Sequence, residues 1–234
     1  MPKSFNQKLK ILYLMQAFME RTDREHPMSV PDLILYLDGY GISVERKTVY
    51  EDIETLRIFG MKIENRREKP SGYYLADRDF SFPELKILMD AVQSSRFITE
   101  QQSRELVRKL EHLTSISEAK RLQSQTSVLS GSKAVNREIY DSIQKICDAM
   151  ADNRQICFNY YEWDFSRELR PKRDGARYRV SPWKMIWNNE NYYLIGLDER
   201  NGIVKHYRVD KIMHVSIESQ KRNGEDIFRN FDFP

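Results

Sequence analysis

Apolar residues recur every three or four positions in three successive segments near the N-terminus, a spacing that predicts three helices. They are expected at Phe5–Arg21, from Ser29 onward with a capping box, and at Ser43–Gly60. The apolar positions of the first helix are Leu9, Leu12, Met15 and Met19. Two short β-like runs, Met61–Glu64 and Gly72–Leu75, complete the order of a winged helix-turn-helix domain over residues 1–78.

The helical spacing continues over residues 79–153. Helices are expected to open at Ser81 and Thr99 and to cover Val135–Ala151, with a loop at Ser124–Ser132. A helical region beside a small N-terminal domain is typical of a linker or a dimerisation element. The alternative is that the apolar stripes of these helices only pack on one another.

From Arg154 the hydrophobic period shortens to two, which predicts strands. Six short runs are expected, at Gln155–Tyr161, Arg167–Pro171, Arg177–Ile186, Asn191–Leu197, Val204–Val209 and Met213–Glu218. Strands of this length and spacing suggest a small β-barrel over residues 154–218, which makes the fold class α+β. Residues 219–234 are expected to form a connecting tail, either cut before a further C-terminal domain or the natural end of a short chain.

Composition narrows the class of protein. The 234 residues are 40% hydrophobic and 31% charged, a balance typical of folded globular chains. No run of about 18 apolar residues occurs, and the first residues lack a signal-peptide core, so we expect a cytoplasmic protein without a membrane partner. Cys147 and Cys157 lack metal-site spacing. Two buried reduced thiols are expected, with a redox switch as the alternative, and neither a metal nor a cofactor.

The net charge of +3 is small, so its distribution is more informative than its size. Residues 1–78 hold 13 basic and 12 acidic side chains, a net of +1, so DNA contacts there would have to come from local patches. Residues 167–184 hold seven basic side chains against two acidic ones. This second segment is where an anionic partner would be drawn.

The third predicted helix has the pattern of a DNA-reading helix. Val49, Ile53 and Leu56 fall on one face, which leaves the opposite face to solvent. Recognition helices place their N-terminal residues in the major groove, where basic and hydroxyl side chains reach bases and phosphates. The candidate DNA contacts are Arg46, Lys47, Thr48 and Tyr50 on the helix and Arg66, Arg67 and Lys69 between the β-runs. For any one of them the alternative is a solvated surface side chain.

The run from Ser43 to Leu56, followed by Gly60, resembles a pattern of bacterial winged-helix regulators of the DeoR type: Ser–Arg–x–Thr–Ile–x–Arg–Asp–Ile–x–x–Leu–x–x–Gly. One departure is Glu51, which stands where that pattern has arginine before the aspartate. The resemblance implies a winged domain that binds duplex DNA, and the departure puts its phosphate contacts in question.

Strand alternation gathers polar side chains in the C-terminal part. His206 and Arg208 are two positions apart and share one face, and so do Arg179 and Ser181. Arginine, histidine, serine and tyrosine hydroxyls together suit an anion such as phosphate. Aromatic neighbours could stack a base, as in proteins that bind single strands.

Residues 154–218 resemble a WYL domain. The name-giving Trp-Tyr-Leu is Tyr192-Tyr193-Leu194 here, Ser181-Pro182 precedes a hydrophobic strand, and the end reads HYRVDKI from His206. The resemblance implies an SH3/Sm-like barrel that senses a ligand, in several members a nucleotide or nucleic acid. It implies Ser181, Tyr193, His206 and Arg208 as ligand residues, to which the basic segment adds Arg179 and Arg170. The alternative for Ser181 and Tyr193 is a core or turn position, and Asp210 is expected to pair with a neighbouring arginine or to cap the next turn.

These expectations together predict a homodimeric transcription regulator, with repression slightly favoured as its sign. Double-stranded operator DNA is its expected partner, and an anionic effector, a nucleotide or single-stranded nucleic acid, is its expected ligand. The rival is an accessory protein that holds RNA or single-stranded DNA and modulates a bacterial defence system without operator control. No acid pair, metal cluster, nucleophile elbow or phosphate-binding glycine loop is apparent, so we expect no enzyme.

Overall fold

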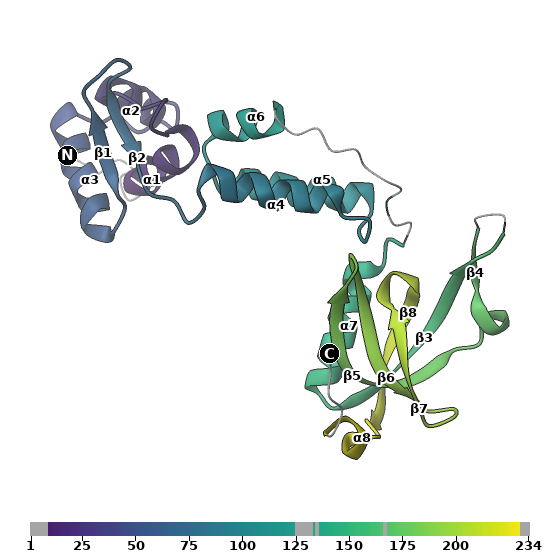
Figure 1. Ribbon diagram of the computed structural model, residues 1–234. Coiled ribbons are helices and arrows are strands. Elements are labelled where there is room, and N and C mark those ends of the chain that lie inside the picture. Colours follow the sequence, from purple (N-terminus) through teal and green to yellow (C-terminus); the bar gives the residue numbers. More distant parts are fainter. Residues whose placement is uncertain (1–8, 125–132, 134–135, 166–167, 230–234) are drawn as a thin grey trace. The chain divides into compact units, whose positions relative to one another are not determined.

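The computed structural model describes residues 9–124, 133, 136–165 and 168–229, and it combines helices with a curled C-terminal sheet (Figure 1). The chain forms two compact units. The first comprises Met1–Gln93 and Arg104–Val128, and the second comprises Ser94–Ser103 and Leu129–Pro234. Within the described ranges, no helix combines the length and the apolar character needed to cross a membrane.

The first unit contains the predicted three helices and hairpin, here α1 (Lys10–Arg21), α2 (Val30–Asp38), α3 (Arg46–Phe59), β1 (Ile63–Arg66) and β2 (Gly72–Leu75) (Figure 1). The start predicted at Phe5 lies outside the described residues. Helix α3 begins at Arg46 rather than Ser43, because Glu45 before it is still extended. The predicted stop at Gly60 is confirmed, since Gly60 adopts the left-handed conformation with φ of 113°.

The stripe predicted to be apolar on α1 is not its buried face. Leu14, Ala17 and Phe18 are fully buried, whereas Leu9, Leu12 and Met19 are exposed. Sequence spacing misses this because residues 12–15 are apolar or aromatic throughout, so two overlapping stripes fit the helical period. Packing against α2 and α3 selects the stripe that ends in Phe18. The core there combines these side chains with Val30, Leu33, Val49, Ile53, Leu56 and Ile63.

The hairpin is fixed by an added backbone pairing. Met28 exchanges two backbone hydrogen bonds with Tyr73 of β2, with N···O distances of 2.9 and 2.8 Å. The two backbones approach so closely that a Cβ on Gly72 would lie 2.5 Å from the carbonyl carbon and oxygen of Met28. Glycine at position 72 therefore permits the hairpin to lie against the segment before α2. At that segment the predicted capping box is confirmed, with Ser29 and Asp32 bonding reciprocally.

Three further helices follow, α4 (Phe82–Ser94), α5 (Glu100–Glu111) and α6 (Ile116–Ser124). Leu85 and Met89 of α4 form a second core with Val107 and Leu122. The sequence reading did not separate α6 from α5. Its predicted loop, Ser124–Ser132, lies outside the described residues except for Ser124, which ends α6.

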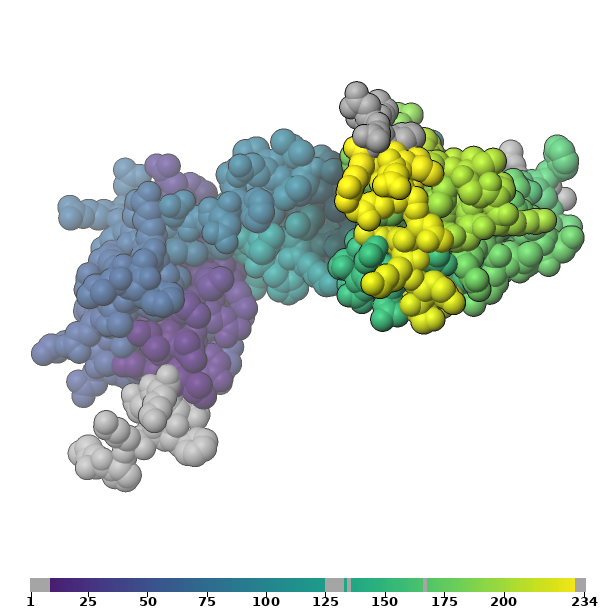
Figure 2. Space-filling model, turned by 90° about the horizontal axis from the view of Figure 1, so that it is seen from below, coloured from purple at the N-terminus to yellow at the C-terminus, as the bar shows by residue number. Residues whose placement is uncertain are grey.

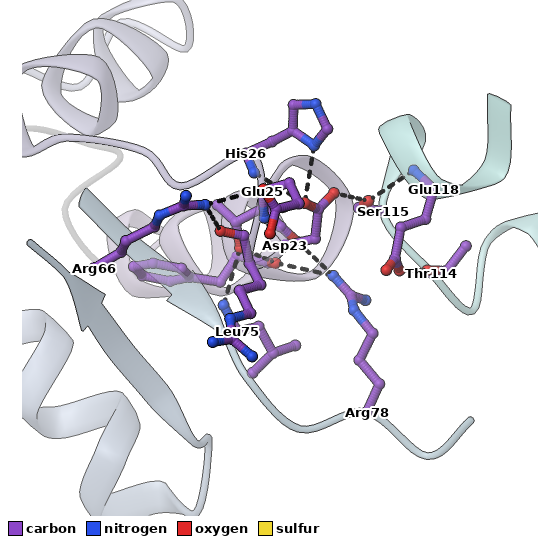
Figure 3. A network of polar contacts seen from close by, with 12 residues as sticks. Asp23, Glu25, His26, Arg66, Leu75, Arg78, Thr114, Ser115 and Glu118 are labelled. Atoms are coloured by element: carbon purple, nitrogen blue, oxygen red, sulfur yellow. Dashed lines mark hydrogen bonds and ion pairs between the residues drawn. The ribbon is translucent and has the colours of Figure 1, made fainter. Parts of the chain in front are cut away.

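A buried polar network joins the α5–α6 connection to the α1–α2 loop (Figure 3). Ser115 donates to Oδ2 of Asp23 at 2.5 Å, and both residues are buried. Oδ1 of the same carboxylate accepts from the backbone N–H of Glu25 and from His26, whose Nδ1 lies 2.8 Å away. Arg78 donates to the Thr22 carbonyl oxygen at 2.7 Å. These bonds attach the helical segment to the three-helix core within the first unit.

The second unit is built on antiparallel strands and one long helix. Its elements are α7 (Ile139–Ala151), β3 (Arg154–Trp163), β4 (Leu169–Pro171), the 3-10 turn η1 (Lys172–Gly175), β5 (Tyr178–Asn188), β6 (Asn191–Asp198), β7 (Ile203–Arg208), the 3-10 turn η2 (Val209–Lys211), β8 (Ile212–Lys221) and α8 (Glu225–Arg229). The strand order is β4-β3-β5-β6-β7, and β8 lies off this path and also pairs with β3. All six predicted strands are present, with ends that differ by up to three residues.

An aromatic cluster fills the inside of the curled sheet. The Phe158 and Tyr178 rings are stacked with centroids 5.7 Å apart, and Tyr207 meets Phe158 edge-on at 5.3 Å. Helix α7 packs on β3 and β8 and buries Ile139 and Ile146.

The described part of the expected connecting tail, as far as Arg229, packs on the sheet. Helix α8 buries Phe228 against Ile195 and Leu197 of β6. The Phe228 ring stacks on Trp183 with centroids 5.1 Å apart. Figure 2 shows this yellow C-terminal segment lying on the surface of the second unit. Apolar residues spaced through a short polar stretch gave too weak a signal to predict it.

Candidate functional site

The first turn of α3 presents basic side chains to solvent. Val49, Ile53 and Leu56 are buried in the core, so Arg46 and Lys47 are directed outward by the helical period. The Lys47 side chain is 87% exposed, and its nearest carboxylate, on Glu51, is 3.9 Å away. Such an exposed pair holds the lysine weakly.

Arg46 and Tyr50 form one surface unit. The Arg46 guanidinium donates from Nε and Nη2 to the Tyr50 hydroxyl at 3.2 and 3.1 Å. The Tyr50 ring in turn meets Tyr73 of β2 with centroids 6.3 Å apart. The hairpin therefore lies beside the first half of α3, and the predicted helix contacts share one surface with it. Thr48 on the same turn is half-buried.

The basic residues of the hairpin differ from one another. Arg67 and Lys69 are exposed at its tip. Arg66 instead donates to the Arg24 carbonyl oxygen at 2.6 Å and to Glu25 at 3.2 Å (Figure 3). Its charge is thus partly used within the protein, which its position in the sequence did not indicate.

In the second unit the register of β6 and β7 brings Tyr193 opposite Arg208. The Arg208 guanidinium donates to both carboxylate oxygens of Asp210 at 3.1 and 2.8 Å and to the side-chain oxygen of Asn191 at 2.8 Å. The bonds to Asp210 hold the pKa of Arg208 above its usual range. The predicted pairing of Asp210 with a neighbouring arginine is confirmed. We call Asn191, Tyr193, His206, Arg208 and Asp210 the Arg208 cluster.

Two more residues complete the surroundings of Arg208. Its backbone N–H donates to the Tyr160 hydroxyl at 3.2 Å, and burial raises the pKa of that phenol. His206 is exposed two positions earlier on β7, on the face that carries Arg208. Sequence reasoning did not name Asn191 as a site residue, although it lies two positions before Tyr193 and so shares its face.

Ser181 and Arg179 lie at the other end of these strands. Ser181 pairs with Leu197 of β6, and Tyr193, which pairs with Ile186, lies four residues before Leu197 on the same strand. Ser181 is therefore roughly 13 Å from Tyr193 along β6. Ser181 is fully buried. Its hydroxyl donates to Glu199 and accepts from the Asn223 backbone N–H at 2.8 Å.

Arg170 belongs to neither group. On β4 it forms ion pairs with Asp164 at 2.7 Å and with Glu168 at 3.3 Å. The six predicted effector residues therefore do not form one site. The structure places Tyr193, His206 and Arg208 together, places Arg179 and Ser181 on β5, and leaves Arg170 in a local charge network.

Cysteines and metal-type residues form no further constellation. Cys147 and Cys157 are free thiols, and burial raises the pKa of each. Across the described ranges, no group of three histidine, cysteine or acidic side chains is arranged to hold a metal ion.

Comparison with known proteins identifies the C-terminal part. The family model of the WYL domain matches residues 141–217. Among solved structures, proteasome accessory factor B/C (PafBC) of Arthrobacter aurescens is similar at 17% sequence identity and a TM-score of 0.33. The match covers 96% of this chain and 35% of that one, so this chain spans about a third of its length. A search of curated proteins finds no match. Residues 141–217, which comprise most of α7 and of the curled sheet, form a WYL domain.

Proposed function

We propose that this protein is a DNA-binding transcription regulator whose WYL domain responds to an anionic effector. The observation that carries the proposal is the surface formed by the first turn of α3 and the adjacent hairpin, held in a different compact unit from the WYL domain. Control of DNA binding by a ligand requires two distinct sites, one for the DNA and one for the effector. In this proposal the two sites lie in separate units. We assign no catalytic residue.

On the first unit, α1–α3 with the hairpin act as a winged helix-turn-helix. Arg46 and Lys47 lie in the first turn of α3, where a recognition helix meets the major groove. The free backbone N–H groups of that turn favour a phosphate. Arg67 and Lys69 at the hairpin tip add phosphate contacts that position the domain without reading sequence.

On the second unit, the Arg208 cluster binds the effector. Asp210 and Asn191 hold the guanidinium in one orientation, which lowers the entropy lost when an anion binds its remaining N–H groups. His206 and Tyr193 add a ring nitrogen and a hydroxyl beside it. A nucleotide or the end of a single strand offers the matching phosphate and a base for stacking.

A homodimer would match this function, because a two-fold axis pairs two reading helices with two half-sites about one helical turn apart. The helical segment after the hairpin supports this proposal. Ile87 on α4 is 68% exposed, and Leu113 and Ile116 near the α5–α6 connection are also exposed. Apolar side chains on the outside of packed helices are suited to pairing with a second copy.

Selection of bound duplexes from a random DNA pool tests the function. We expect an enriched inverted repeat, and we expect the Arg46→Ala/Lys47→Ala variant to bind that duplex at least tenfold more weakly. Lys109→Ala, which removes a surface charge from α5, is the matched control and should bind as the native chain does. Retention of single strands without any enriched duplex would overturn operator binding and favour the accessory nucleic-acid protein instead.

A further inference from the structure

A hollow in the WYL unit lies away from the Arg208 cluster. It has a volume of about 510 Å³ and is lined by residues of β3, β5, β8, η1 and the turn after β6. Small-molecule sites span about 300–1,000 Å³, so the hollow has room for more than an inorganic ion. Four arginines and three carboxylates line it, and Cys157 contributes to its wall.

The three carboxylates are already bonded within the protein. Asp198 is buried and accepts from Lys205 and from the Tyr207 hydroxyl, the latter at 3.2 Å. Glu199 accepts from Ser181 and, at 2.7 Å, from the side-chain amide of Asn223. Glu218 accepts from the Ser216 hydroxyl at 2.9 Å. These bonds hold the three carboxylates in place, and among the donors named the cationic one is Lys205, on Asp198.

Two of the four arginines are likewise occupied. Arg177 donates to the carbonyl oxygens of Cys157 and His214, both at 3.0 Å, and to the Ser216 hydroxyl at 2.8 Å. Arg173 lies over the Tyr178 ring, 4.4 Å from its centroid. Both guanidinium groups therefore act as fixed parts of the wall.

Arg179 and Arg200 remain available. Both are exposed, and among the residues that the structure describes neither has a carboxylate within 4.0 Å. The Glu199 backbone N–H donates to the Arg179 carbonyl oxygen at 3.0 Å, which keeps Arg200, the next residue, close to Arg179. The Arg179 guanidinium lies beside the Cys157 thiol, and hydrogen bonding to that thiol holds the pKa of Arg179 above its usual range.

We propose that this hollow, the Arg179 pocket, binds a phosphate or diphosphate group carried by a small metabolite. Two available guanidinium groups match the paired oxygens of such a group, because each can donate two parallel N–H bonds. The remaining volume accepts the organic part of the ligand. The site goes beyond the proposed function, since it does not use Arg208 and does not depend on DNA binding.

Calorimetric titration of the full chain with pyrophosphate and with ADP tests the pocket. Arg179→Ala and Arg200→Ala should each weaken binding by roughly tenfold or more, the loss expected for charge-assisted hydrogen bonds. Lys145→Ala, on α7 outside the pocket, removes one surface charge and should leave the affinity unchanged. ADP binding tenfold more tightly than pyrophosphate would assign a nucleotide, and equal affinities would assign the diphosphate group alone.

A second readout uses the wall thiol. In the Cys147→Ser background, saturating pyrophosphate should slow the reaction of Cys157 with iodoacetamide several-fold, and Arg179→Ala should remove this protection. Native-like affinity in the Arg179→Ala/Arg200→Ala variant would overturn the proposal. So would absence of binding by both probes, or loss of binding on Arg208→Ala alone. None of these outcomes bears on operator selection, which tests the proposed function separately.

Discussion

The cations in the first turn of α3 and two arginines of the second unit, Arg208 and Arg177, are held in opposite ways. Lys47 extends into solvent and has one distant carboxylate partner, while Arg46 donates to the neutral hydroxyl of Tyr50. In the sheet, Arg208 and Arg177 each donate to several acceptors in a fixed geometry. Mobile charges suit a phosphate backbone, which tolerates many positions of the cation, whereas fixed charges suit one anion of one shape.

The largest expected effect comes from disrupting the hairpin, which should destabilise the first unit alone. In Gly72→Ala the new Cβ would overlap the Met28 backbone, at a position whose φ of 156° also disfavours a side chain. We expect the first unit to lose about 3 kcal/mol of unfolding free energy. Denaturant unfolding with two-domain analysis should show an earlier first transition and an unchanged one for the WYL unit.

Gly41→Ala is the matched control. Gly41 also has a positive φ, of 71°, but a Cβ there would meet nothing within 4 Å. It should cost about 1 kcal/mol, the conformational term without the overlap. Equal losses in the two variants would contradict the close approach of Gly72 to Met28.

Replacing Arg208 and Arg46 in turn with lysine tests the difference between a fixed and a mobile arginine. Arg208→Lys keeps the charge but removes the fork to Asp210, so affinity for a labelled single-stranded oligonucleotide should fall roughly 10- to 100-fold. Arg46→Lys keeps a mobile cation on α3, so affinity for the selected duplex should change by less than about threefold. Fluorescence anisotropy measures both, and the reverse ranking would contradict the comparison.

The first unit does contain a fixed polar group, but it is internal. Ser115→Ala removes the hydroxyl that donates to the buried Asp23 carboxylate, which should cost about 1–2 kcal/mol of unfolding free energy at pH 7. Ser124→Ala, whose exposed hydroxyl donates to the Arg121 carbonyl oxygen, is the control and should cost less than about 0.5 kcal/mol.

The same variant has a defined pH dependence. Burial alone would raise the pKa of Asp23, but hydrogen bonds from Ser115 and His26 outweigh burial and place it below 3.8. A lowered carboxyl pKa stabilises the fold above its unfolded value, and that stabilisation is lost as pH falls through the folded value. The difference between native and Ser115→Ala chains should therefore be largest above pH 5 and shrink below 3.8. A constant difference would remove the carboxylate from the explanation.

Local patterns predicted most of the secondary structure because each element carries its own signal. The Ser29 capping box, the Gly60 stop and the two-residue period after Arg154 depend on neighbours in sequence. The buried face of α1 and the docking of Phe228 depend on partners far along the chain. No local period could choose Leu14 over Leu12 on α1, because both fit a helical stripe.

The candidate site was predicted less completely for the same reason. Strand alternation placed Arg208 beside His206, and the register then brought Tyr193 opposite. It could not show that the Ser181 hydroxyl accepts from the Asn223 backbone N–H, because that bond joins residues 42 positions apart. The Arg179 pocket likewise depends on the turn after β6, whose position against β5 no pattern in the sequence specifies.

The smallest expected effect concerns Lys47. Lys47→Ala removes one exposed cation, so affinity for the selected duplex should fall only a few-fold at moderate salt. The slope of log affinity against log salt should become less negative by about 0.9, the contribution of one phosphate contact. An unchanged slope would place Lys47 off the phosphate backbone.

Glu51→Gln tests whether the mobility of that lysine matters. Glu51 stands 3.9 Å from Lys47 on the same face, so it both restrains the lysine and repels DNA phosphates. Neutralising it should raise duplex affinity a few-fold without changing unfolding free energy by more than about 0.5 kcal/mol, because exposed pairs contribute little stability. The same change should leave pyrophosphate binding at the Arg179 pocket unaffected. A drop in duplex affinity would mean that Glu51 holds Lys47 in its binding position, and the α3 cations would then resemble the fixed arginines of the sheet.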